Sequence, residues 1–580
     1  MNGGYGTQPN FAVLALLPAP PGMTSLACSK SSRERLVQAV YLVSNVTSLP
    51  HVPGVSRIVP CILCILNFFG LVCESVQASP YCEPVISFEA ASDRLTQAQA
   101  DLLVVPCHSD SGSSPVPGPG AAEAATALGI DLAATLGARG FTGEIGDTFA
   151  TLALGRLAAS GVLFVGFGVR EQTGPGAVRQ AAMRAAGEMS KAARIAVALP
   201  DADQAVAAAF AEGLLLGAYQ FDRYRRQPVA PGWRPPILEH VSVLTSGARE
   251  AAVDTGLRRG QAMAELTNWV RDMVNASPSD TTPDDMANQA HELADTHGLA
   301  CSVMTVPDLA AGGFGGILGV GQGSRNEPRL VELSYRGGGD APVIGLTGKG
   351  ITFDSGGLNL KRDAEIEWMK SDMAGAASIM AVLRGAVEFG LPVNIDAVLP
   401  FAENMPGGAA QRPGDVITHR GGKTSEVRDT DAEGRLIVAD SLAYLAERNP
   451  AVLVDVATLT DAAGLGEGLW AVLGTDEQQI GLLVDAGREA GDPGWHLPLP
   501  RAYRRYFASA AADVRNTPAG VPDTTVMAAT YLREFTGGLP WMHIDNGSTA
   551  YLDRPGDGWP EGATGSPARA LLRWLEQWAG

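Results

Sequence analysis

Short apolar runs alternate with alanine-rich windows of helical character over most of the chain. Three runs are typical of strands buried on both faces: 101–106, 161–165 and 194–199. Three windows of helical character accompany them, near residues 121–137, 175–193 and 203–220. Strands and helices in alternation predict an α/β domain with a mainly parallel sheet.

The alternation stops at a proline-rich segment, residues 227–236, and returns in the second half of the chain. A long helical window at 249–274 precedes Thr282, which we expect to cap a helix that begins at Pro283. Further elements are predicted downstream: strands at 343–347, 393–399 and 452–458, helices at 373–389 and 435–447, and a hairpin over 414–428 that turns at Gly421-Gly422.

These changes of pattern predict four parts of the chain. A length of 580 residues exceeds what one hydrophobic core supports, so at least two domains are expected. The predicted parts are an N-terminal extension at 1–84, an α/β domain at 85–236, a linker helix at 237–280 and a second α/β domain at 281–580.

The first 84 residues differ in composition from the rest, with four Lys/Arg and three Asp/Glu. Their longest apolar run, residues 58–72, is interrupted by Pro60, Asn67 and Gly70 and is too short for a membrane span. A signal peptide would place such a run nearer the N-terminus. A cryptic export segment, a lineage-specific extension and a start codon assigned too early all stay open. We favour the last two and expect this region to be poorly ordered.

Charge and cysteine content narrow the class of protein. A net charge of −19 without a Lys/Arg cluster argues against a nucleic-acid surface. Five of the seven cysteines fall in the first 82 residues, which leaves Cys107 and Cys301 for the remainder. So few cysteines after residue 82 are typical of a reduced protein without disulfides. We therefore expect a cytoplasmic protein without stable membrane association, with export as the lesser alternative.

Charged residues are concentrated in the stretch RDTDAEGRL, residues 428–436. Asp431, Glu433 and Arg435 occupy alternate positions, and if the segment is extended their side chains point to one face. Like charges at such proximity are unfavourable unless a cation lies between them, so the stretch is interpreted as half of a metal site. A solvated charged turn is the alternative, and these nine residues alone do not decide.

A second stretch, GKGITFDSGGLNLK at 348–361, directly follows a predicted buried strand. In open α/β sheets ligands bind beyond the carboxyl ends of strands, so Lys349 and Asp354 are well placed to contact one. The glycine pair 356–357 would allow close approach of backbone or substrate. Asp372 is expected at or near the N-terminus of the next helix.

Signatures of other enzyme classes are missing from the sequence. The eight histidines include no His-Glu-x-x-His pair, and no Gly-x-Ser-x-Gly elbow occurs. The glycine-rich segments before Lys349 and Lys423 lack the spacing of a phosphate-binding loop. If this is a metal enzyme, carboxylates hold the metal.

Seven residues and the motifs around them closely resemble the leucyl aminopeptidases of the M17, or cytosol aminopeptidase, family. They are Lys349, Asp354, Lys361, Asp372, Asp431, Glu433 and Arg435, separated by 5, 7, 11, 59, 2 and 2 positions. Supporting motifs are ENMPGG at 403–408, RPGD at 412–415 and DVATLT at 455–460. The resemblance covers roughly residues 85–580 and is strongest from 340 to 460.

The resemblance implies a metal-dependent aminopeptidase with a smaller, macro-like N-terminal α/β domain and a C-terminal α/β/α catalytic domain with a mixed central sheet. It implies that two divalent ions are bound by five residues: Lys349, Asp354, Asp372, Asp431 and Glu433. Lys361 would stabilise the developing oxyanion, and Arg435 would hold a bicarbonate that acts as general base. Four carboxylates balance the charge of two dications, and Lys349 can ligate only as a neutral amine.

The implied cofactors and partners follow from the same resemblance. Oxygen ligation without His or Cys suits Mn²⁺ best, with Mg²⁺ or Zn²⁺ as alternatives. Water activated by two ions would release the N-terminal residue of a peptide. The family also implies a homohexamer. The alternative function is a catalytically weak relative that acts as a DNA-binding or regulatory protein, as some family members do.

The chain departs from the family pattern at two positions. Asp429 stands where the family usually has Asn, which adds an acid near the site. Asp461 follows ATLT where the family has Gly, and we expect it to narrow the pocket for the N-terminal side chain or to favour basic residues there. The residues expected in this pocket are Met369, Thr458, Leu459 and Asp461.

Overall fold

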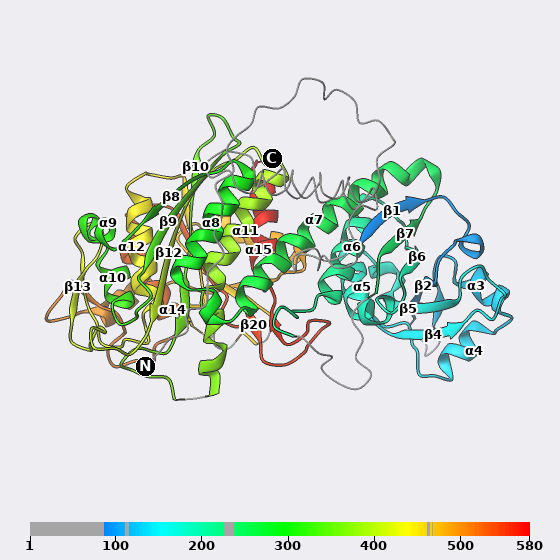
Figure 1. Cartoon of the computed structure of the whole chain (residues 1–580), viewed down its shortest axis with the longest axis horizontal. Helices are drawn as coiled ribbons and strands as arrows, with labels where there is room; N and C mark the ends of the chain where they lie inside the picture. The colour runs from blue at the N-terminus through cyan, green and yellow to red at the C-terminus, as the bar shows by residue number, and fades with distance from the viewer. Residues whose placement is uncertain are drawn as a thin grey trace, which may run out of the picture. The chain divides into compact units, whose positions relative to one another are not determined.

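The computed structural model describes residues 86–110, 115–225, 237–362, 364–460, 465–466 and 468–579. Three features predicted from the sequence lie outside these ranges: the extension at 1–84, the proline-rich segment at 227–236 and the residue Asp461. The described residues form two large sheets with helices around them, which confirms the predicted α/β fold class (Figure 1).

The N-terminal sheet has the strand order β1-β7-β6-β2-β5-β4, and β3 pairs with β2. Its strands are β1 (Ser87–Ala91), β2 (Leu102–Ser109), β3 (Val116–Pro117), β4 (Thr148–Leu152), β5 (Gly161–Val169), β6 (Arg194–Ala198) and β7 (His240–Leu244). Only β3 and β4 run antiparallel to a neighbour within the described part of this sheet, so it is mainly parallel as predicted.

Helices α3 (Ala121–Leu128), α4 (Leu132–Gly137), α5 (Pro175–Met189) and α6 (Gln204–Ala218) accompany this sheet. The window of helical character predicted near 121–137 contains two helices, α3 and α4. Gly129 adopts a φ of 71° after α3 and ends it, and Asp131 then caps α4 by accepting a hydrogen bond from the N–H of Ala134.

The connection between the two sheets begins later than the pattern predicts. Strand β7 follows the boundary at residue 236, yet it pairs with β1 and β6 of the N-terminal sheet. The long helix α7 (Glu250–Asn275) comes next, and then α8 (Pro283–His297). Thr282 caps α8 and Pro283 occupies its first turn, as predicted.

The C-terminal sheet has the order β17-β16-β19-β15-β10-β12-β9-β8, and β11 also pairs with β12. Its strands are β8 (Ala300–Met304), β9 (Arg329–Arg336), β10 (Val343–Gly348), β11 (Gly350–Asp354), β12 (Asn394–Asn404), β15 (Val452–Ala457), β16 (Trp470–Gly474), β17 (Gly494–His496) and β19 (Trp541–Asp545). Parallel pairs lie at its centre, whereas β9 runs antiparallel to β12 and β16 to β19, so the sheet is mixed.

Smaller elements surround this sheet. The helices are α9 (Val306–Gly312), α10 (Gly315–Gly321), α11 (Ala374–Glu388), α12 (Gly434–Ala446), α13 (Glu477–Ala490), α14 (Thr525–Leu532) and α15 (Ala568–Ala579). The predicted hairpin is formed by β13 (Val416–Thr418) and β14 (Thr424–Glu426), and β18 (Val514–Arg515) adds to it. The pair β20 (Tyr551–Leu552) and β21 (Gly562–Ala563) lies near the C-terminus of the chain.

Central strands supply two separate hydrophobic cores, because successive side chains of a strand point to opposite faces. Val452, Val454 and Val456 of β15 belong to the core that contains side chains of α7, α8, α11 and α15. Leu453 of the same strand belongs to the core that contains side chains of α10, α12 and α14. Helices therefore cover both faces of the C-terminal sheet (Figure 1). None of the helices in the described ranges has the length and apolar character of a membrane span.

Candidate metal centre

The predicted ligands lie at strand ends and helix starts. Lys349 separates β10 from β11, and Asp354 is the last residue of β11. Asp372 comes two residues before α11, and Glu433 is the N-cap of α12. Strand β10 lies between β15 and β12, so these side chains gather at the carboxyl end of the central parallel strands, where ligands of open α/β sheets bind.

Lys349 lies among acids in the interior. Its Nζ is 2.9 Å from Asp372 Oδ1 and 2.9 Å from Glu433 Oε1, and it donates to the carbonyl oxygen of Thr458 at 2.9 Å. Thr458 in turn donates its hydroxyl to Asp372 Oδ1. A Cβ at Gly434 would lie 2.6 Å from this Nζ, so only glycine lets the start of α12 approach the amine this closely.

Lys361 bridges the other two acids. Its Nζ is 2.9 Å from Asp354 Oδ2 and 2.7 Å from Asp431 Oδ1. Asp354 is buried, while Asp431 and Lys361 are partly open toward a cavity. The structure thus brings together four carboxylates and two lysines from segments up to 84 residues apart in the sequence.

The stretch 431–435 is not extended, so its alternate side chains do not share one face as they would in a strand. Glu433 has helical torsions, φ −81° and ψ −37°, and Arg435 lies in the first turn of α12. The acids converge because a turn at 429–432 precedes the helix, and not because alternate residues of a strand share a face.

Burial and mutual repulsion raise the pKa values of three acids of the cluster, Asp372, Asp431 and Glu433. Burial, together with the charges of Asp354 and Glu433, raises the pKa of Asp431 to about 7. Burial also raises the pKa of Asp372 and of Glu433. For Lys349, burial by itself lowers the pKa, but the charges of Asp372 and Glu433 outweigh it and the pKa rises. This cluster holds more negative charge than its lysines balance, and it favours a bound cation.

Several oxygen atoms of the cluster lack a hydrogen-bond donor. Among the described residues, Asp372 Oδ2 and Glu433 Oε2 are buried without any donor. Leaving a buried carboxylate oxygen unpaired is costly unless a cation takes the place of the donor. Asp354, Asp431 and Glu433 each offer an oxygen within 4.8 Å of the others. Oxygen donors in this arrangement fit divalent ions such as Mn²⁺ or Mg²⁺.

Arg435 contacts groups outside the acid cluster. Its Nη1 donates to the carbonyl oxygen of Asn516 at 2.7 Å and lies 2.9 Å from Asp523 Oδ2. Its buried Nε has no partner among the described residues. The guanidinium therefore keeps donor capacity for a further anion, although the chain's own Asp523 already engages one side of it.

The side chain of Asp429, where the resemblance leads us to expect Asn, stabilises the turn that contains Asp431. Its Oδ1 accepts the backbone N–H of Asp431 at 2.9 Å. Asn516 closes the same turn: its Oδ1 accepts the N–H groups of Arg428 and Asp429, and its Nδ2 donates to the carbonyl oxygen of Asp429. The Asp429 carboxylate thus acts as a turn acceptor.

Sequence reasoning missed Asn516, Asn404 and Thr430. Asn516 and Thr430 are fully buried, and Asn404 is 1% exposed. Thr430 donates its hydroxyl to the carbonyl oxygen of Gly356 and so joins the two ligand-bearing loops. Asn404 lies inside the ENMPGG motif, but the predicted strand ends at residue 399, so the pattern did not place Asn404 beside Asp354. For Asn516, 81 residues after Arg435, the sequence holds no signal.

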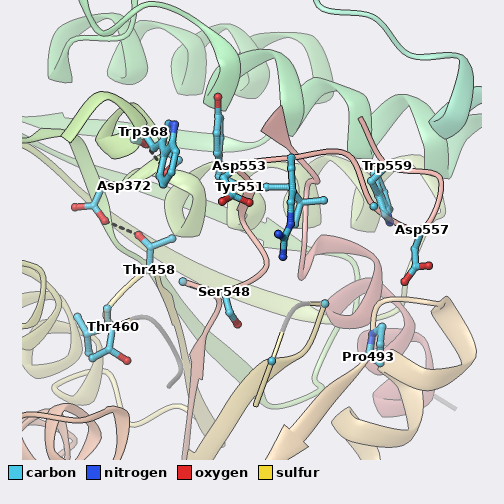
Figure 2. Close-up of a pocket in the computed structure, with 18 of the residues that line it drawn as sticks. Trp368, Asp372, Thr458, Thr460, Pro493, Ser548, Tyr551, Asp553, Asp557 and Trp559 are labelled. Atoms are coloured by element: carbon cyan, nitrogen blue, oxygen red, sulfur yellow. Dashed lines mark hydrogen bonds between the residues drawn. The ribbon is translucent and has the colours of Figure 1, made fainter. Parts of the chain in front are cut away.

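A cavity of about 1030 Å³ opens beside the acids. Lys349, Asp354, Lys361, Asp372 and Asp431 line one part of it. Three residues predicted for the substrate pocket, Met369, Thr458 and Leu459, line it as well. Trp368, Tyr551 and Trp559 add an aromatic lining that was not predicted from the sequence (Figure 2).

A two-domain α/β chain with a buried acid and lysine cluster at the carboxyl ends of its central strands defines a class of metallohydrolase. This chain belongs to the cytosol aminopeptidase family. The model of the family's catalytic domain matches residues 268–572, and the model of its N-terminal domain matches residues 104–228.

Individual relatives agree with this assignment. The chain is 38% identical over 497 residues to a probable cytosol aminopeptidase of Streptomyces coelicolor, covering 82% of this chain and 96% of the relative. It is 40% identical over 452 residues to a probable cytosol aminopeptidase of Roseiflexus castenholzii, covering 76% and 91%.

Solved structures show the same fold. The bottromycin maturation enzyme BotP in complex with Mn superposes with a TM-score of 0.72 at 35% identity, over 83% of this chain and all of that one. A mutant of tomato leucine aminopeptidase superposes with a TM-score of 0.76 at 26% identity, over 86% and 98%. The chain is therefore a metal-dependent aminopeptidase, which confirms the predicted family and enzyme class.

Proposed function

We propose that this chain releases the N-terminal residue of peptides at a centre that holds two divalent ions. The ligands would be the five residues assigned by the resemblance: Lys349, Asp354, Asp372, Asp431 and Glu433. The observation that carries this proposal is their convergence at one place, where oxygen atoms of Asp372 and Glu433 lack any donor among the described residues.

Each of the chain's own residues has a role that follows from its position. Divalent ions bound here would supply Lewis-acid chemistry and a water of lowered pKa. Lys361 lies between Asp354 and Asp431 and lines the cavity, so its ammonium can donate to the carbonyl oxygen of the first peptide bond as negative charge develops there.

We assign Arg435 to the bicarbonate that would serve as general base. Its Nε, which has no partner among the residues that the structure describes, supports this role, because a guanidinium presents donors in a fixed fork that suits a planar anion. Asp523 competes for the same guanidinium at 2.9 Å, so the anion would share Arg435 with this carboxylate or displace it.

The cavity supports peptide substrates. A volume of about 1030 Å³ exceeds that of a single side chain, and we assign Met369, Thr458 and Leu459, which line the cavity, to the pocket for the N-terminal side chain. For Asp461 we keep the proposal that it narrows this pocket or favours basic residues. Asp461→Gly should then shift the ranking of leucine, arginine and lysine anilides, and an unchanged ranking would contradict the role.

We further propose Mn²⁺ as the working metal, with Mg²⁺ or Zn²⁺ as alternatives, a homohexameric assembly and a cytoplasmic location. BotP, a relative by structure, is described in complex with Mn. Carboxylate-rich ligation favours the same ion. The location rests on the relatives described as cytosol aminopeptidases. A mass of about six chains in light scattering would support the assembly.

Replacing Glu433 by Ala tests the metal centre directly. Glu433 is 1% exposed and contacts Lys349, and we expect it to contribute to both ion sites. The variant should lose nearly all turnover of a leucine anilide and bind fewer Mn²⁺ ions per chain in calorimetry on metal-stripped protein.

Glu447→Ala provides the matched control. Glu447 follows the same helix α12 and pairs with Arg420 at 2.8 Å, away from the cavity. This variant should keep both metal stoichiometry and turnover. Substantial turnover in Glu433→Ala, with Mn²⁺ binding unchanged, would overturn the assignment.

A further inference from the structure

Asn404 contacts both loops that carry the acids, although no role has been assigned to it so far. It is the last residue of β12 and the register partner of Asp354 on the neighbouring parallel strand β11. Its side-chain Nδ2 donates to Asp354 Oδ1 at 2.7 Å and to the carbonyl oxygen of Thr430 at 2.9 Å. At 1% exposure, the amide is shielded from water.

The chemistry of these partners fixes the orientation of the amide. A carboxylate and a backbone carbonyl can only accept, so the amide nitrogen of Asn404 must face both Asp354 and Thr430. The opposite edge faces Gly357, where a Cβ would lie 2.8 Å from Asn404 Oδ1. Gly357 has a φ of 65°, and the absence of a side chain there leaves room for the amide.

Two donors determine which oxygen of Asp354 is left for a cation. Oδ1 accepts from Asn404 Nδ2 and from the N–H of Gly356, at 2.7 and 2.9 Å. Oδ2 receives neither bond and faces Lys361 Nζ at 2.9 Å. Asp354 therefore presents a single oxygen, Oδ2, toward the centre of the cluster.

The Asn404 amide also connects Asp354 to the loop that contains Thr430 and Asp431. Thr430, whose carbonyl oxygen Asn404 binds, directly precedes Asp431 in the chain. Thr430 also donates its hydroxyl to the carbonyl oxygen of Gly356, two residues after Asp354. Asn404 and Thr430 together hold the two acids at a fixed separation, although 77 positions divide them in the sequence.

We propose that Asn404 is a positioning residue of the metal centre: it holds Asp354 so that Oδ2 alone is offered to one ion, and it holds Asp431 at the distance that this ion requires. The inference rests on the proposed function, since it needs the centre to bind divalent ions. Hydrogen-bonding partners of metal ligands contribute substantially to affinity even though they never touch the metal.

Two variants separate loss of the donor from loss of packing. Asn404→Ala removes the amide and leaves a cavity, whereas Asn404→Leu fills nearly the same space without donating a hydrogen bond. Mn²⁺ affinity, measured by calorimetry on metal-stripped protein, should fall by about 10- to 100-fold for one site in both variants. Turnover should recover at saturating Mn²⁺, because Asn404 is not one of the residues that line the cavity.

Thr352→Val is the matched control. Thr352 is fully buried on β11, and its hydroxyl donates across the same strand pair to the carbonyl oxygen of Ala402. This variant removes a buried hydrogen bond without contacting either acid, so Mn²⁺ affinity should stay within about twofold of the wild type. Circular dichroism checks that each variant is folded, and the Leu variant covers the case in which the Ala cavity unfolds the protein.

The results separate this inference from the proposed function. If the wild type binds two Mn²⁺ ions per chain and both Asn404 variants bind them as tightly as Thr352→Val, the positioning role is wrong and the metal centre stands. If the wild type binds no divalent ion, the proposed function itself fails. A selective loss in the Asn404 variants, restored in turnover by excess Mn²⁺, supports the inference.

Discussion

Asp429, where the resemblance leads us to expect Asn, acts in the structure as an acceptor within the turn before Asp431. Its carboxylate accepts the N–H of Asp431 at 2.9 Å, and the side-chain oxygen of an asparagine can accept the same bond. The extra charge of Asp429 is half-buried and does not belong to the group of three acids whose oxygens lie within 4.8 Å. The turn therefore explains the residue without a role in binding the ions.

Asp429→Asn should consequently change little. We expect Mn²⁺ affinity and the pH optimum of turnover to stay close to those of the wild type, whereas Asp429→Ala should weaken Mn²⁺ binding because the turn loses its acceptor. Calorimetry and a pH profile of anilide turnover measure both effects. A clear shift of the pH optimum in the Asn variant would instead show that the additional charge acts on the centre.

At the scale of elements, the sequence predicts strands and helices well where the pattern is strong. Strands β10 and β15 and helices α11 and α12 lie within a few residues of the predicted ranges, because each is largely buried and rich in apolar residues. The window at 121–137 is helical as predicted, but the break between α3 and α4 was not predicted, because alanines continue the helical pattern on both sides of Gly129, whose φ is 71°.

The contacts between elements were harder to predict than the elements. The spacing of Asp431, Glu433 and Arg435 suggested a shared face of an extended segment, but Glu433 has helical torsions. The seven family residues could be named because their motifs are specific. Asn404 could not, since its role depends on the register of β12 against β11, which periodicity does not encode.

For the whole molecule, the acid and lysine cluster comes from the C-terminal half of the chain, whereas the cavity beside it is also lined by Arg179 and Met183 of α5. The acids, both lysines and Asn404 lie between residues 349 and 433, and the lining residues Tyr551 and Trp559 come from near the C-terminus. The N-terminal sheet has its own core, formed by residues of β2, β5, β6, α5 and α6. The two domains therefore have separate cores, and the acid and lysine cluster belongs to the C-terminal domain.

The first strand of the N-terminal sheet sets a boundary that can be tested. Strand β1 begins at Ser87 and pairs with β7, and the family model of the N-terminal domain begins at residue 104. A chain that starts at residue 86 keeps every described strand and helix, so we expect it to fold, to bind Mn²⁺ with unchanged stoichiometry and to turn over a leucine anilide at the wild-type rate. Light scattering on the same sample should give the same number of chains per particle as the full-length protein.

A folded but inactive product, or a smaller particle, would show that residues 1–85 contribute to the centre or to the assembly. Deletion to residue 93 is the matched comparison, because it removes β1 and should reduce stability by exposing β7 as an edge strand.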